Sequence, residues 1–166
     1  MEKEQIYQEI TPCSKLLKTG EAFIMRVITF TDIKKAIEER YNPSGAAVIF
    51  YDMGKGCGKR SVKRFMSKYK DKVKLLNVIA KHKKYEGWGN VEFKIDLKKQ
   101  IGEVIVSNSF EAKQYGASSN PVCYFFKGYL SGVLSEVLER DVNLIEEECI
   151  AKGDKVCRFK LTPPSS

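Results

Sequence analysis

Alternation of apolar and polar residues is clearest in the middle of the chain, from position 91 onward. Apolar side chains there recur at every second position, and charged side chains fill the positions between them. This period of two predicts a half-buried antiparallel strand over 91–97. The segment GEVIVSNSF at 102–110 is its expected hairpin partner.

Three other stretches show helical spacing. An amphipathic pattern runs from 31 to about 43, and a second covers 71–85. The third follows Asn120 and Pro121, a capping residue with proline at the first helical position, and predicts the main core helix over 121–139. Its two glycines, one turn apart, would allow another backbone to come close.

The N-terminal third gives weaker patterns. The segment AFIMRVITF at 22–30 is apolar and β-branched, which predicts a strand. Residues 44–70 remain ambiguous, because SGAAVIFYDM suits a buried strand, while the glycines that follow also suit a helix packed closely against a neighbour.

The chain is expected to close with a hairpin, 142–151 and 155–161, that turns at Lys152-Gly153-Asp154. With a three-residue loop, Cys149 lies directly opposite Cys157, on one face with Ile145, Phe159 and Leu161. Strict alternation puts Glu147 on that face. A β-bulge between 146 and 148 would put Glu146 there instead.

Length and termini favour a single domain over 1–162 with a disordered tail at 163–166. The N-terminus has no apolar run typical of a signal peptide, and no window approaches the roughly 18 apolar residues of a membrane span. We therefore expect a cytoplasmic protein with reduced thiols. Its five cysteines then point to burial, metal binding or reactivity.

The net charge of +8 is concentrated in residues 55–84, which carry twelve Lys or Arg and the single acid Asp71. Such a stretch could bind nucleic acid through phosphate neutralisation. Lysine-rich helix faces are usually solvated, however, and no DNA-reading motif is present, so nucleic acid is not the expected partner. The residues that could share a helical face are Lys59, Arg60, Lys63, Arg64, Ser67 and Lys68.

The paired thiols of Cys149 and Cys157 suggest a metal site. Cys123 offers a third thiol in the first turn of the core helix, where backbone N–H groups favour thiolate. Three sulfurs and one carboxylate would complete the tetrahedral set that zinc prefers. A cross-hairpin disulfide and plain buried cysteines are the alternatives.

The C-terminal segment CYFFKGYLSGVLSEVLERDVNLIEEECIAKGDKVCRFKL, with its pattern E-x-x-C-x-A-x-G-D-x-x-C, resembles the 4-vinyl reductase domain family. The resemblance is specific over 115–161. It implies an α/β (α+β) fold in which an antiparallel sheet packs against helices, similar to haem nitric-oxide sensor domains and Golgi-tethering subunits. Homodimers are usual among such proteins.

The same family forms the sensory half of bacterial phenol-responsive activators, where a structural zinc has a helix cysteine, a glutamate and two hairpin cysteines. That spacing falls here on Cys123, Glu146, Cys149 and Cys157. The resemblance thus implies a structural Zn²⁺ and a cavity for a small hydrophobic or aromatic molecule. Candidate cavity walls are Phe50, Tyr51, Phe65, Trp88, Phe93, Phe125, Phe126 and Tyr129.

The phenol sensors hold their ligand with a histidine and a tryptophan. Here only His82 and Trp88 are available, in a lysine-rich segment, and we expect His82 to be a solvated helix residue. No haem-ligating histidine can be assigned. Without ATPase or DNA-binding segments in this sequence, a sensor would signal through its own dimer or a partner protein.

The family name also suggests an enzyme that reduces a vinyl group on a tetrapyrrole-like substrate. The sequence has no dinucleotide fingerprint, no phosphate loop and no evident acid and base pair. The preferred interpretation is therefore a zinc-stabilised module that binds or senses a hydrophobic ligand, with reductase and nucleic-acid binding as the alternatives.

Overall fold

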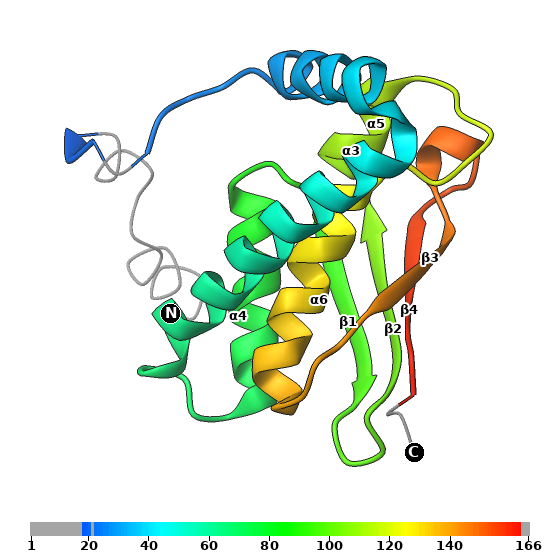
Figure 1. The fold of residues 1–166 in the computed structure, drawn as a ribbon. Helices are drawn as coiled ribbons and strands as arrows, with labels where there is room; N and C mark the ends of the chain where they lie inside the picture. The colour runs from blue at the N-terminus through cyan, green and yellow to red at the C-terminus, as the bar shows by residue number, and fades with distance from the viewer. Residues whose placement is uncertain (1–17, 21, 164–166) are drawn as a thin grey trace.

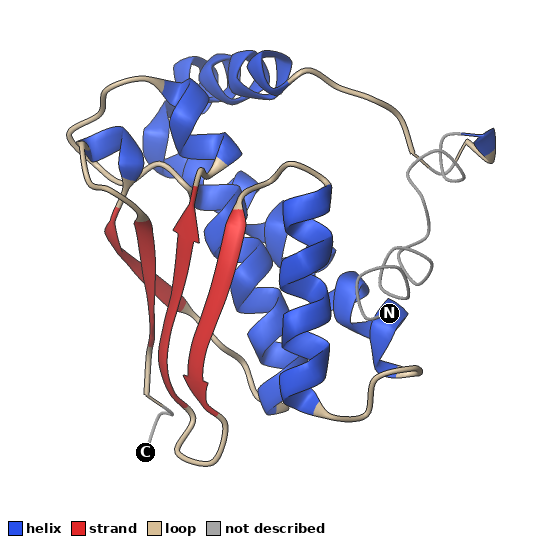
Figure 2. Cartoon of the chain, turned by 180° about the vertical axis from the view of Figure 1, so that it is seen from behind, coloured by secondary structure: helices blue, strands red, loops and turns tan. Residues whose placement is uncertain are grey.

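The computed structural model describes residues 18–20 and 22–163. Four antiparallel strands form one sheet in the order β1-β2-β4-β3. Helix α6 lies between the sheet and helix α3 (Figure 1), and the helices cover one face of the sheet (Figure 2). This confirms the expected α+β fold. None of the helices in the described part of the chain is long and apolar enough to span a membrane, and 164–166 of the expected tail lie outside the described residues.

Helix α3 (Val27–Met66) is much longer than the sequence indicates. The strand predicted over 22–30 is wrong, because 22–26 pair with no strand and the helix starts at Val27. The end predicted near Asn42 is a kink, where φ is 63° and Pro43 follows. The Asn42 side chain accepts the N–H of Gly45 at 3.0 Å and so caps the continuing helix.

The ambiguous 44–70 segment is helical as far as Met66 because it packs directly on α6 (Tyr124–Leu138). A Cβ atom on Gly58 would lie 2.1 Å from the carbonyl oxygen of Tyr129, and one on Gly128 would lie 2.0 Å from that of Tyr51. The two backbones are therefore in contact, which only glycine permits. The helical alternative for this segment is the correct one.

The other predicted elements form with small changes of boundary. Helix α4 (Lys72–Tyr85) begins after Asp71, whose side chain accepts the N–H of Lys74. Strand β1 (Asn90–Asp96) pairs with β2 (Ile101–Ser107) as the alternation predicts. The second strand ends early because a short helix, α5 (Phe110–Tyr115), follows it.

Helix α6 begins three residues later than Pro121 because Val122 and Cys123 are still non-helical. The carboxylate of Glu111 on α5 accepts the N–H groups of Phe125 at 3.1 Å and Phe126 at 2.9 Å. A side chain from another element therefore satisfies the free donors at this helix start, in place of Asn120.

The closing hairpin contains β3 (Leu144–Glu148), a short 3-10 helix η1 (Ile150–Lys152) and β4 (Cys157–Leu161). Its register shifts between Glu146 and Glu148. The shift is the bulge considered from the sequence, and it turns Ile145 outward to 54% exposure. The prediction that Ile145 shares the cysteine face is therefore wrong, and Cys149 follows the strand instead of pairing within it.

Candidate metal centre and ligand pocket

A buried cluster of three thiols and one carboxylate lies between the start of α6 and the closing hairpin. One ligand atom from each residue can be chosen so that all of them lie within 4.8 Å of one another. The Cys123 sulfur is 3.5 Å from that of Cys157 and 4.0 Å from that of Cys149. The four residues predicted as metal ligands, Cys123, Glu146, Cys149 and Cys157, are thus brought together and could hold a metal ion.

These distances suit a tetrahedral metal. Zn–S bonds of about 2.3 Å in a tetrahedron put neighbouring sulfurs about 3.8 Å apart. Glu146 Oε2 accepts the N–H of Cys123 at 3.1 Å, while its Oε1 is buried and has no hydrogen-bond partner in the described part of the chain. An unpartnered buried carboxylate oxygen beside three thiols fits a cation.

Backbone groups fix the cysteines in place. The N–H of Ile150 donates to the Cys157 sulfur at 3.4 Å, and that of Cys149 donates to the Asp154 carboxylate at 2.8 Å. The bulge directs Glu146 inward, because without it the strand would alternate and present Glu147. The hairpin therefore presents two thiols and one carboxylate to Cys123.

Charge repulsion and burial govern the protonation of the cluster. Hydrogen bonds from the thiols of Cys123 and Cys157 lower the pKa of Cys149 strongly. Burial raises the pKa of Cys123, and burial with the nearby Cys149 thiolate raises the pKa of Glu146 to about 9. One thiolate therefore forms readily and opposes further ionisation, which a bound cation would relieve.

A buried ion pair lies next to this cluster. Lys34 on α3 donates to Glu111 at 2.7 Å, and both side chains are at most 1% exposed. Lys34 also donates to the carbonyl of Val122, the residue before Cys123. Burial raises the pKa of the Glu111 carboxyl, whereas Lys34 and the amides of Phe125 and Phe126 lower it. This pair connects α3 and α5 to the start of α6.

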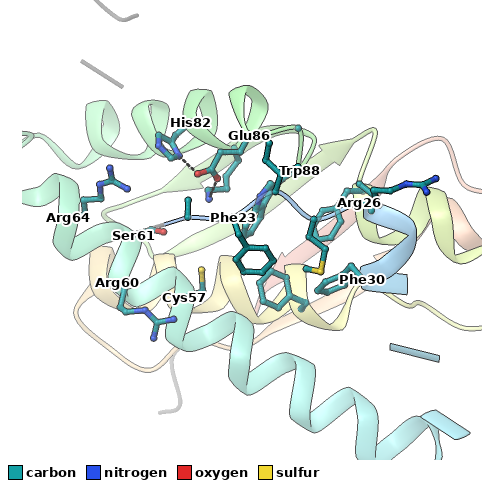
Figure 3. Close-up of a pocket in the computed structure, with 18 of the residues that line it drawn as sticks. Phe23, Arg26, Phe30, Cys57, Arg60, Ser61, Arg64, His82, Glu86 and Trp88 are labelled. Atoms are coloured by element: carbon teal, nitrogen blue, oxygen red, sulfur yellow. Dashed lines mark hydrogen bonds and ion pairs between the residues drawn. The ribbon is translucent and has the colours of Figure 1, made fainter. Parts of the chain in front are cut away.

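A separate pocket of about 740 Å³ opens between the 22–30 segment, α3 and α4 (Figure 3). Its residues come mainly from these three elements and from the starts of α5 and α6. The walls are mostly aromatic and aliphatic, with one group of polar side chains. The lining residues are Ala22, Phe23, Ile24, Met25, Arg26, Val27, Phe30, Cys57, Arg60, Ser61, Arg64, Phe65, His82, Lys83, Glu86, Gly87, Trp88, Phe110 and Phe125.

The polar side chains of α4 form a compact set. His82 is 4% exposed and packs edge-on against Phe65, so the expectation of a solvated histidine is wrong. Its Nδ1 lies 3.2 Å from Glu86, which also pairs with Lys83. Burial opposes ionisation of Glu86, but the hydrogen bond with His82 and the charge of Lys83 lower its pKa to about 2. The Lys83 ammonium lies 3.7 Å from the centre of the Trp88 ring.

The eight candidate wall residues separate into two groups. Phe65, Trp88 and Phe125 line the pocket, whereas the other five do not. Of these, Phe50, Phe126 and Tyr129 are buried, and Tyr51 and Phe93 are partly buried. The sequence interpretation missed wall residues from 22–30, because that segment was assigned to a strand. Its run of apolar residues was the available signal.

The basic 55–84 stretch does not form one uniform face. Lys55 pairs with Asp141, Lys72 pairs with Glu139, and Lys83 is buried at the pocket. Arg60 and Arg64, two members of the predicted basic face, line the pocket. Part of the charge assigned to a solvated surface thus lies at the ligand pocket.

The fold and the two sites are those of a small α+β sensory domain. The structure superposes on the phenol-responsive sensory domain of the transcription activator PoxR with a TM-score of 0.73, at 22% identity over 86% of this chain and 76% of that one. A vinyl-4-reductase family protein from Methanocaldococcus jannaschii gives a TM-score of 0.56 and 24% identity, over 87% of this chain and 99% of the other.

Sequence comparison gives the family. Residues 103–163 match the model of the vinyl-4-reductase domain, which confirms the resemblance to the 4-vinyl reductase family. Uncharacterized protein MJ0150 of Methanocaldococcus jannaschii is 29% identical over 69% of this chain and 64% of its own length. Phenol regulator MopR of Acinetobacter guillouiae is 37% identical over 39% of this chain and 12% of its own. The chain thus spans less than two thirds of either relative.

Proposed function

We propose that this chain is a zinc-stabilised domain that binds a small hydrophobic molecule and acts as a sensor. The observation that carries the proposal is the aromatic pocket of about 740 Å³ beside α4. Its volume lies within the roughly 300–1,000 Å³ range of small-molecule sites. The similar PoxR domain was solved with phenol, and MopR is a phenol regulator, which supports a ligand of related character.

Native mass spectrometry of the purified protein tests the ligand. We expect a species heavier than the apo chain, whose extra mass is released as a small organic molecule on denaturation. Trp88→Ala should reduce the occupancy, because Trp88 contacts Phe110 and Phe125 across the pocket. Phe93→Ala, outside the pocket, is the control. Addition of phenol and alkylphenols to stripped protein with no mass shift at millimolar concentration would contradict an aromatic ligand.

The zinc is proposed to be structural. Cys123, Glu146, Cys149 and Cys157 would fill all four positions and leave none for water, so the ion would connect the hairpin to α6 without acting on a substrate. We expect one zinc per chain in native spectra, lost in Cys149→Ser and retained in Cys57→Ser, whose cysteine lies outside the cluster. A metal-free protein with a Cys149–Cys157 disulfide would refute the site.

A second copy of this chain is the proposed partner of α3. Several apolar side chains on this helix are exposed, among them Tyr41 at 57%, Val48 at 61% and Met53 at 53%. Such a row, left uncovered on one helix, is typical of an interface. Sedimentation should show a dimer that Val48→Glu dissociates and Lys63→Glu does not. A monomer for the unmodified chain would leave signalling to a different partner protein.

A further inference from the structure

The pocket has two chemically distinct ends (Figure 3). At one end the Trp88 ring lies 5.6 Å from Phe110 and 5.4 Å from Phe125, and Phe30 lies 5.6 Å from Phe125. At the other end Arg60 and Ser61 project from the last turns of α3, with Arg64 one turn further on. A ligand that fills both ends must be apolar at one end and polar at the other.

The charges of the pocket are unbalanced. Four fixed cations, Arg26, Arg60, Arg64 and Lys83, line it together with the single carboxylate of Glu86. That carboxylate is already used, because Lys83 and His82 both interact with it. Within 18–20 and 22–163, no carboxylate pairs with either Arg60 or Arg64.

The positions of Arg60 and Arg64 make this imbalance costly. Like charges four residues apart on a helix repel each other, by about 0.2–0.5 kcal/mol in isolated helices. An acidic group held between the two guanidinium groups would remove the repulsion and could accept paired N–H bonds from either side chain. The arrangement is therefore complementary to an anion at this end of the pocket.

The apolar end lacks a cover. Phe23 and Ile24 line the pocket, yet they are 77% and 82% exposed. Such exposure leaves apolar surface in water at the pocket mouth. An apolar ligand body that extends from the Trp88 end along this segment would cover it. The volume of about 740 Å³ leaves room for such a body in addition to a headgroup.

We propose that the ligand is an amphiphile with an acidic headgroup, a carboxylate or a phosphate. Arg60 and Arg64 bind the headgroup, and the aromatic rings around Trp88 with the 22–30 segment enclose the apolar body. This inference rests on the proposed ligand-binding function and adds the chemical class of the ligand. A neutral phenol lacks the charge that the two arginines would recognise.

The single tryptophan of the chain makes the test direct, since Trp88 lines the pocket. Stripped full-length protein is titrated with dodecanoate, dodecyl phosphate and dodecanol, each below its micelle concentration, while Trp88 fluorescence is recorded. The first two ligands distinguish a carboxylate from a phosphate head, and dodecanol has the same chain without charge. We expect at least one acid to bind about tenfold more tightly than dodecanol, and its affinity to fall with added salt.

Variants locate the headgroup. Arg60→Gln and Arg64→Gln should each weaken binding of that acid several-fold and leave dodecanol unchanged. Lys63→Gln removes an exposed charge of the same helix outside the pocket and should change neither. Equal affinities for acid and alcohol, insensitive to both arginine variants, would overturn the acidic headgroup but keep the pocket as a ligand site. Failure of all three compounds to alter Trp88 fluorescence would overturn the amphiphile, while aromatic ligands detected by native mass spectrometry would still support the sensor.

Discussion

Replacement of Lys34 by methionine should destabilise the protein more than most surface or core changes. Methionine keeps a long apolar side chain of similar volume but removes the ammonium. In the folded protein that ammonium satisfies the Glu111 carboxylate at 2.7 Å and the carbonyl of Val122. The Lys34 side chain is 1% exposed and that of Glu111 is 0% exposed, so water cannot replace the lost partner.

The magnitude follows from burial. Breaking a buried ion pair by removal of one partner costs about 3–5 kcal/mol, because the other charge is left uncompensated. Two of the bonds to Glu111, from the amides of Phe125 and Phe126, survive the change and favour the lower end of that range. We expect a loss of about 3 kcal/mol in the free energy of unfolding, a large part of the roughly 5–15 kcal/mol typical of a domain.

The loss should depend on pH. Without Lys34, burial raises the pKa of folded Glu111 further above its unfolded value of about 4.3. A raised folded pKa gives stability that is present at low pH and is lost as the pH rises. The deficit of Lys34→Met relative to the unmodified protein should therefore be larger at pH 7.5 than at pH 5.

Urea unfolding followed by far-UV circular dichroism at several pH values measures both effects. Lys35→Met is the matched control, because its neighbouring side chain is exposed and should change the free energy by at most about 0.5 kcal/mol. In the double variant Lys34→Met/Glu111→Gln, the cost should be less than the sum of the single costs. A loss below 1 kcal/mol that is the same at both pH values would refute the reasoning.

Three further predictions concern the helix contact, the pocket and the metal. Gly58→Ala should cost about 3 kcal/mol in urea unfolding because its Cβ meets the α6 backbone, whereas Gly56→Ala, which faces only a flexible arginine at 3.3 Å, should stabilise α3 by up to about 1 kcal/mol; equal effects would contradict the close contact. Glu86→Gln should lose about 1–2 kcal/mol at pH 7 after allowance for solvent screening. Because the folded pKa is lowered to about 2, this difference should vanish as the pH falls from about 4.5 to 2 in the same assay, and a constant difference would contradict the pairing with His82. Chelation of the proposed zinc should lower the thermal midpoint, and a midpoint unaffected by complete metal removal, verified by elemental analysis, would argue against a structural ion.

The sheet and the C-terminal half could be predicted from sequence because their signals are local. Alternation over 91–97 requires only that one face of the strand be buried, and the structure places β1 there. The apolar spacing of 121–139 similarly predicts α6, since this helix is buried by both the sheet and α3. Where a local pattern and tertiary burial agree, the prediction is confirmed.

The N-terminal half could not be predicted because tertiary contacts override local preference there. The apolar run 22–30 satisfies strand propensity, yet its residues line a pocket or begin a helix. Asn42 and Pro43 normally end a helix, and here they produce only a kink. The burial of His82 likewise depends on Phe65, seventeen positions earlier, which no periodicity within α4 reports.

The candidate metal cluster was predictable in composition but not in geometry. A hairpin of regular register would place Cys149 opposite Cys157 and point Glu146 away from both. The choice between Glu146 and Glu147 depends on the shifted register, which a sequence pattern permits but does not require. The resemblance to the family, not the spacing alone, selected the residue that the structure brings to the thiols.

The bulge in β3 makes the site depend on chain length as well as on ligand identity. Glu146 and Cys149 are separated by three positions, an odd number that a regular strand would direct to opposite faces. Deletion of either Glu147 or Glu148 would preserve every proposed ligand and still remove the extra residue of the bulge. A related sequence can therefore contain all three cysteines and a glutamate and yet lack the site, so the count of residues between ligands is as diagnostic as the ligands themselves.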